Sequence, residues 1–232
     1  MLERLSPKAN GLLAINIAAL IFGTAALYGK LDAAPVWITA MRASFGALAL
    51  LVLGGLSRQL LRLPAKSWLL LGLSGALLGC HWLTFFISVQ LSGVAVATLT
   101  FATFPLLTVT VEAMAQRRMP GLTELLAAVA IILAVALLLQ PDSGGNESVA
   151  GTLAGLASAV AYAFFWRVTQ HLQQPLSPAS LSLVQNSLVF VLLLPALFHA
   201  TPVPAGTTSW LALGALGVVN TAVLLLLYLY AL

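Results

Sequence analysis

Long apolar stretches, separated only by short polar connections, dominate this sequence. About 20 apolar residues are what an α-helix needs to cross the roughly 30 Å hydrocarbon core of a bilayer. Leu and Ala are the commonest residues in these stretches and no alternation of apolar and polar residues runs through them, so helices rather than a β-barrel are expected. We therefore predict an all-α membrane protein with eight transmembrane helices. The predicted spans are 10–30, 35–57, 66–90, 93–115, 121–140, 150–170, 178–200 and 208–232.

The composition supports the membrane class. Hydrophobic residues make up 61% of the chain, charged residues make up 7%, and the mean hydropathy is +1.05. The short connections leave no room for a soluble domain. The net charge of +4 does not indicate nucleic acid as a partner, because the basic residues are distributed according to membrane topology. The expected partners are the lipid bilayer and a small-molecule substrate, and no cofactor is expected.

Alternate connections carry the basic residues. The basic set is Arg4, Lys8, Arg58, Arg62, Lys66, Arg117, Arg118 and Arg167. The connections on the other side hold Lys30, which Asp32 offsets, together with Asp142 and Glu147. Because basic residues concentrate in cytoplasmic connections, the N-terminus is predicted to be cytoplasmic. We expect a multi-pass protein of the bacterial inner membrane.

A nine-residue phrase at 67–75 recurs at 209–217, and each copy opens a predicted span. The two spans are the third and the eighth, so the copies must enter the membrane from opposite sides. The segment 11–14 matches 151–154 at a similar offset, and Pro35 matches Pro178 in the same way. Inverted repeats of this kind are typical of secondary transporters, in which two half-bundles surround a midplane site.

The repeat divides the chain into two units. Residues 1–141 form a first repeat of five spans, and residues 149–232 form a second, inverted repeat of three spans. We therefore expect the last two helices of a ten-helix fold to be missing. The open flank that they would leave faces lipid unless a homodimer closes it.

Several phrases carry a family resemblance. They are the segment 21–30 (IFGTAALYGK), a lone Arg42, His81-Trp82 followed by Phe85-Phe86, the segment 101–108 (FATFPLLT), and Gln185-Asn186 followed by Pro195. The chain resembles EamA-type members of the drug/metabolite transporter superfamily. The resemblance implies two inverted five-helix halves around a central cavity. It also implies export or import of amino acids, other small metabolites or drugs without a bound cofactor. The run 223–227 in the last span departs from the family pattern, because it offers no hydrogen bond.

Two titratable residues inside the spans are the strongest candidates for substrate binding. Arg42 lies about 10 Å from the outer end of its span, and His81 lies roughly 20 Å from the inner end of the next. Buried charge in a membrane usually faces a polar interior. Arg42 is thus a candidate for a substrate carboxylate, with a purely structural arginine as the alternative. His81 is a candidate proton acceptor or hydrogen-bonding group, with a neutral imidazole bound to a neighbouring helix as the alternative.

The remaining candidates are aromatic, hydroxyl and amide residues. The aromatic rings would wall a pocket or only pack helices, the threonines would line it or bond their own carbonyls, and the amides would bind substrate or join helices. Pro105 is a candidate hinge, because it cannot donate to the carbonyl of Phe101. The other candidates are Trp82, Phe85, Thr100, Thr103, Tyr162, Trp166, Gln185 and Asn186.

These features favour a secondary transporter, an exporter of small organic metabolites such as amino acids or drugs, working by alternating access. The alternative is an inactive truncated fragment or a non-transporting membrane interaction subunit. An intramembrane enzyme is not expected, since the spans contain no aspartate and His81 is the only histidine well inside a span.

Overall fold

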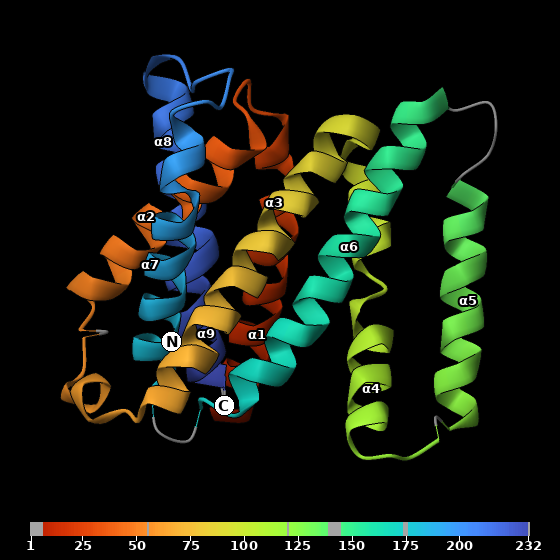
Figure 1. The fold of residues 1–232 in the computed structure, drawn as a ribbon, viewed down its shortest axis with the longest axis horizontal. Helices are drawn as coiled ribbons and strands as arrows, with labels where there is room; N and C mark the ends of the chain where they lie inside the picture. Colours follow the sequence, from red (N-terminus) through yellow and green to blue (C-terminus); the bar gives the residue numbers. More distant parts are fainter. Residues whose placement is uncertain (1–6, 55, 120, 139–144, 174–175, 232) are drawn as a thin grey trace, which may run out of the picture.

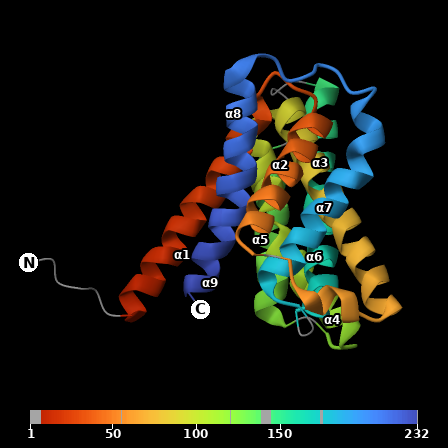
Figure 2. The ribbon, with the colours of Figure 1, turned by 90° about the vertical axis from the view of Figure 1, so that its left-hand side faces the viewer.

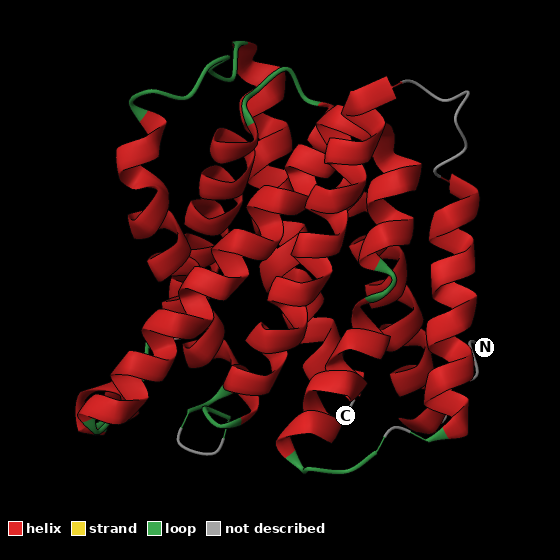
Figure 3. Cartoon of the chain, turned by 45° about the vertical axis from the view of Figure 1, so that its right-hand side comes forward, coloured by secondary structure: helices red, strands yellow, loops and turns green. Residues whose placement is uncertain are grey.

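The computed structural model describes residues 7–54, 56–119, 121–138, 145–173 and 176–231, and in this part of the chain every regular element is a helix (Figures 1 and 3). The elements are α1 (Pro7–Thr24), the 3₁₀ helix η1 (Ala25–Lys30), α2 (Pro35–Val52), the 3₁₀ helix η2 (Arg58–Arg62), α3 (Ala65–Phe101), α4 (Phe104–Ala115), α5 (Leu122–Leu138), α6 (Gly145–Gln170), α7 (Pro178–Leu197), α8 (Gly206–Gly217), the π-helix η3 (Val218–Val223) and α9 (Leu224–Ala231). The chain therefore has the predicted all-helical class.

Six of the described helices are long and apolar enough to cross a membrane. They are Asn10–Lys30, Pro35–Val52, Ala65–Phe101, Val149–Gln170, Pro178–Leu197 and Gly206–Leu227. This number differs from the eight predicted spans, in part because α3 covers the predicted span 66–90 and the beginning of the span 93–115. The rest of the span 93–115 is α4, which at 12 residues is too short to cross a membrane alone.

A break at Gly93 divides α3. Gly93 has φ 82° and ψ 168°, a backbone conformation that only glycine adopts readily. A straight helix of 37 residues would be about 55 Å long, well beyond the hydrocarbon core. Instead the chain turns back near this residue at the top of Figure 1 and descends towards α4. The reversal therefore falls where the sequence separated its third and fourth spans.

Helices α3 and α6 make the most extensive contact between elements, and they pack through small residues. A Cβ added to Gly155 of α6 would overlap Thr100 Oγ1 and lie 2.9 Å from Ser88 Oγ. Gly151, one turn earlier, lies against Ser92 in the same way. Small residues at this spacing let two backbones approach closely in a membrane, where dispersion contacts replace the hydrophobic effect between helices.

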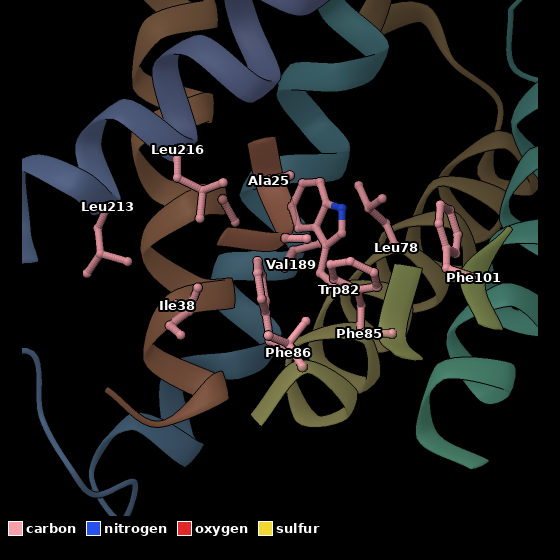
Figure 4. Packing of buried hydrophobic residues seen from close by; sticks show 14 of the residues in the cluster. Ala25, Ile38, Leu78, Trp82, Phe85, Phe86, Phe101, Val189, Leu213 and Leu216 are labelled. Atoms are coloured by element: carbon pink, nitrogen blue, oxygen red, sulfur yellow. The ribbon is translucent and has the colours of Figure 1, made fainter. Parts of the chain in front are cut away.

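The core lies between α2, α3, α7 and α8. Figure 4 shows Ile38, Phe86, Val189, Leu213 and Leu216 there, and all five are 0% exposed. The first two come from helices of the first half of the sequence and the other three from helices of the second half. At one end of the bundle, the Ala34 amide donates to Pro202 O at 2.8 Å and Trp37 Nε1 donates to Ala200 O at 3.0 Å. These bonds tie the connection after η1 to the connection after α7. Helix α1 packs along η3 and α9, and in Figure 2 it diverges from the other helices towards its N-terminal end.

Candidate functional site

A cavity of about 80 Å³ lies between the α1–η1 junction, α2 and α3. Four of the predicted site residues line it, namely Arg42, His81, Trp82 and Phe85. The other lining residues are Phe22, Gly23, Ala25, Ala26, Thr98 and Phe101. The cavity is therefore apolar and aromatic, with one permanent cation and one imidazole in its wall.

Arg42 enters this cavity from the middle of α2, and its side chain is almost fully buried, with 6% of the residue exposed. Its guanidinium carbon lies 4.1 Å from the centre of the Trp82 ring, which is cation–π distance. Nη2 donates a long bond of 3.4 Å to the carbonyl oxygen of Asn220 in η3, and Nε has no hydrogen-bond partner among the described residues. An arginine held this loosely in an apolar wall keeps donor capacity for a bound anion.

His81 enters the cavity one position before Trp82 on α3. Its Nδ1 lies 2.8 Å from Ser158 Oγ and 3.2 Å from Ser158 O, and Ser158 Oγ donates to His81 O at 3.0 Å. A reciprocal pair of contacts therefore joins α3 to α6 at the imidazole.

An aromatic cluster backs the cavity on the side of α4 and α6. The Tyr162 ring lies 4.8 Å from His81, 5.4 Å from Phe101 and 5.0 Å from Phe104, measured between ring centres. Phe101 and Phe104 stack at 4.9 Å across the break between α3 and α4. Tyr162 thus supports the wall from behind without lining the cavity. Trp166, one turn further along α6, is half-buried and lies outside the lining as well.

The two predicted threonines are buried but bond to their own helix. Thr100 Oγ1 donates to Val96 O at 2.7 Å, and Thr103 Oγ1 donates to Thr100 O at 2.7 Å. Neither lines the cavity, whereas Thr98 does. The helix is interrupted at Ala102 and Thr103, and α4 begins at Phe104 with Pro105 in its first turn. The helix is therefore interrupted where the proline predicted a bend. The role of Pro105 as a hinge remains a prediction.

The two predicted amides lie between helices, away from the cavity lining. Gln185 Nε2 donates to Ser74 Oγ at 3.2 Å and to Thr169 Oγ1 at 3.0 Å, so it joins α7 to α3 and α6. Asn186 Nδ2 donates to Ser182 O at 2.8 Å within α7, and its Oδ1 is buried without a partner. This placement corresponds to the helix-joining alternative for Gln185.

Comparison with known proteins identifies the family. The model of the EamA-like transporter family matches residues 9–140 and 149–232, which together make up most of the chain. The chain belongs to the EamA-like transporter family. The EamA chain is 26% identical over 209 residues to the "Uncharacterized transporter YwfM" of Bacillus subtilis (strain 168), an alignment that covers 86% of this chain and 70% of that protein. A solved crystal structure of a protein without a stated function shares the fold, with a TM-score of 0.64 and 24% identity, covering 97% of this chain and 79% of that one.

The site of this EamA protein includes residues that the sequence did not single out. Asn220 Nδ2 donates to Ile21 O at 2.5 Å and to Thr24 Oγ1 at 3.0 Å, while its carbonyl accepts from Arg42. The run 223–227 in the middle of the last predicted span is apolar, and the polar pair Asn220-Thr221 lies just before the end of η3, within this π-helix. That pair of polar residues in an apolar span was the available signal. Ser158 gave none, because its span is rich in small residues throughout.

A second, wider hollow of about 460 Å³ lies between η1 with the connection that follows it and α3. Gly29 and Val89 line its inner side, and a Cβ on Gly29 would lie 2.6 Å from Val89 Cγ1 and 3.2 Å from Phe86 Cδ1. The remaining lining residues are Lys30, Leu31, Asp32, Ala33, Gln90 and Pro202. In this EamA chain the two hollows follow one another along η1 and α3, with the contact of Gly29 on Val89 and Phe86 between them.

Proposed function

We propose that the chain is a secondary transporter that exports small organic metabolites, such as amino acids or drugs, by alternating access. The substrate binds in the cavity between α1, α2 and α3. The observation that carries this proposal is Arg42, a buried cation with a free Nε donor in the wall of a cavity inside a helix bundle. Ionisable residues in such positions mark substrate paths in membrane transporters. Family membership and the relative named as a transporter support the transport class.

We infer further that the fold is an inverted repeat with units at 1–141 and 149–232, crossing the membrane eight times. Two separate family matches, with a gap between residues 140 and 149, support the division. The directions of the helices support the inversion, since the chain runs up α1 and α7 but down α2 and α6 in Figure 1. Counting α3 as two crossings joined at Gly93, the second continued by α4, gives seven, and the 17-residue α5 gives the eighth.

The size of the cavity supports alternating access. Its volume of about 80 Å³ is below the roughly 150 Å³ of an engineered cavity that binds benzene. A solute the size of an amino acid therefore needs a wider site than this conformation offers. Movement of the α1–η1 segment and α2 relative to α3 would supply that space, and rocking of half-bundles about a central site is how inverted-repeat transporters work.

Uptake and counterflow in proteoliposomes test the proposal. The protein would be reconstituted, loaded with unlabelled solute, and exposed to labelled carboxylates, amino acids, amines and sugars. We expect saturable uptake of a subset of the panel that is accelerated by the same solute inside. Protein-free vesicles and vesicles containing Arg42→Gln are the controls. A folded wild-type protein that accelerates none of the panel over protein-free vesicles would contradict the proposal.

A further inference from the structure

The contact between His81 and Ser158 determines which imidazole nitrogen carries the proton. Ser158 has a single hydroxyl hydrogen, and Oγ donates it to His81 O at 3.0 Å. The same oxygen lies 2.8 Å from Nδ1, and both contacts are made together when Nδ1 donates to Oγ. Ser158 O, at 3.2 Å from Nδ1, is also an acceptor and favours the same assignment. The neutral ring therefore carries its hydrogen on Nδ1.

This assignment leaves Nε2 with a lone pair. Among the described residues none donates a hydrogen bond to Nε2, and His81 lines the cavity. Protonation of Nε2 would place a second positive charge in a small cavity that Arg42 already lines, which the apolar wall disfavours. The cavity thus offers a fixed acceptor from α3 as well as the cation from α2.

The other polar groups of the wall further limit the chemical class of ligand that fits the cavity. The Thr98 hydroxyl donates its hydrogen to Val94 O at 2.7 Å, so it is not a donor to the cavity. No described residue in the cavity wall carries a carboxylate. A cationic ligand therefore meets Arg42 and no counter-charge, whereas a carboxylate meets a guanidinium whose Nε is free.

We infer that the ligand is a small carboxylic acid that also carries an O–H or N–H donor. The carboxylate faces Arg42, the donor faces His81 Nε2, and Ser158 is the positioning residue that holds the acceptor tautomer. The inference rests on the proposed function, because it names the substrate class of the same cavity. A buried acceptor rejects an analogue without the donor more strongly than an apolar pocket rejects a change of size.

Isosteric pairs of acids test this class directly. We would compare 2-hydroxyisobutyrate with pivalate, and 4-hydroxyphenylacetate with 4-methylphenylacetate, since each pair exchanges a hydroxyl for a methyl. Binding to the purified full chain would be measured by titration calorimetry in detergent. The hydroxy acid of at least one pair should bind more tightly, by roughly 2- to 10-fold, because one neutral hydrogen bond contributes about that much. Equal binding within both pairs, or tighter binding of the methyl acids, would overturn the inference.

Variants separate the roles of the three residues. His81→Leu should remove the preference within a pair, while His81→Gln, which keeps an acceptor, should retain part of it. Arg42→Gln should weaken both acids of a pair by the same factor. Ser158→Ala should reduce the preference within a pair, because Nδ1 of His81 loses the hydroxyl that holds its hydrogen. The matched control is Ser187→Ala, a serine that bonds only Leu183 O within α7. An undiminished preference in His81→Leu contradicts the role of His81.

Failure of this inference is distinct from failure of the proposed function. Wild-type protein that transports another solute, but binds none of the four acids, overturns the substrate class and leaves transport in place. Protein that binds the hydroxy acids with the expected preference, but accelerates no solute across vesicles, supports the ligand class and contradicts transport.

Discussion

Arg42 is held inside the bundle by an aromatic face and a backbone carbonyl, with no carboxylate among the described residues that line its cavity. The Trp82 ring lowers the cost of burying the cation without neutralising it. The carbonyl of Asn220, which accepts from Arg42 Nη2 at 3.4 Å, lies in the π-helix η3. A charge stabilised in this way keeps its long-range attraction for an anion, which a tight ion pair would cancel.

Replacing Arg42 should therefore remove transport of carboxylate solutes without unfolding the protein. We expect Arg42→Ala to reduce the initial rate at low solute concentration by at least about 10-fold, since it removes a charge-assisted hydrogen bond. Arg42→Lys should restore only part of the rate, because a lysine cannot present the planar fork of a guanidinium. Initial uptake rates, normalised to monodisperse protein, measure the effect. Wild-type rates in Arg42→Ala would leave Arg42 with a structural role only.

The candidates that line the cavity are those with the strongest sequence signal. A charge, an imidazole and aromatic rings stand out in an apolar span, and Arg42, His81, Trp82 and Phe85 meet as a result. Thr100 and Thr103 do not line the cavity, because a threonine in a helix can satisfy itself on a carbonyl of the preceding turn. Ser158 contacts His81 and Asn220 contacts Arg42 because of which helices are neighbours in the fold. The positions of the spans in the sequence do not contain that information.

At the scale of the elements, the contact between α3 and α6 determines how closely the two halves of the sequence approach. Glycines at 151 and 155 leave room for the hydroxyls of α3, and Ala159 and Ala163, further along α6, are both fully buried. Because a larger side chain at these positions would separate the two backbones, the contact tolerates little increase in side-chain volume.

Gly155→Ala should destabilise the protein. The added methyl would overlap Thr100 Oγ1, and the lost packing should cost about 1–3 kcal/mol in the free energy of unfolding. Gly72→Ala on α3 is the matched control, since a Cβ there has nothing within 4 Å and alanine is the better helix former. Denaturant unfolding in mixed micelles measures both variants. A loss in Gly155→Ala no larger than in Gly72→Ala would show that α3 and α6 separate without cost.

Pro105 belongs to the same scale, because it begins α4 just after the break at Ala102 and Thr103. Pro105→Ala supplies a backbone donor for the carbonyl of Phe101 and favours one continuous helix. If the break bends during transport, the maximal uptake rate should fall several-fold while the affinity for solute stays the same. Parallel measurement of binding and of the maximal rate separates these effects, and an unchanged maximal rate would argue against a hinge.

The boundaries of the helices were predictable where a proline marks the start of a helix. Pro35 and Pro178 open α2 and α7 at the predicted positions, because in the first turn of a helix proline gives up no intrahelical hydrogen bond. The chain reverses at Gly93 without an intervening loop. The third predicted span and the beginning of the fourth therefore form the single element α3. The π-helix η3, which begins at Val218, packs against α1 and α2, and the periodicity of the sequence reveals neither the change of helix type nor these neighbours.

At the scale of the whole molecule, the charges define the two ends of the bundle. Arg118 pairs with Glu124 at 2.9 Å and Arg167 with Glu112 at 3.4 Å, both at the end opposite to the connection after η1. Arg4 and Asp142, and the side chains of Lys8 and Glu147, entered the predicted asymmetry but lie outside the described part of the chain. The remaining basic residues still favour a cytoplasmic position for the Arg118 end.

Labelling of single cysteines tests this orientation. In a Cys80→Ser background, a membrane-impermeant maleimide should label Asp32→Cys in intact cells. It should label Arg62→Cys and Arg118→Cys only after the membrane is made permeable. Asp32 and Arg118 lie in connections and Arg62 ends the short helix η2, so their substitution should not disturb the core. Labelling of Arg62→Cys or Arg118→Cys in intact cells, with Asp32→Cys protected, would reverse the assignment.

The 3₁₀ form of η1 gives the segment between the two hollows a reserve of length. A 3₁₀ helix rises about 2.0 Å per residue and an α-helix about 1.5 Å, so these six residues are about 3 Å longer than they would be as α-helix. Rewinding η1 into α1 would shorten this path and draw Gly29 away from Val89 and Phe86 by a comparable distance. The passage between the hollows would then widen through a local change of helical pitch, and α2 and α3 would keep their places.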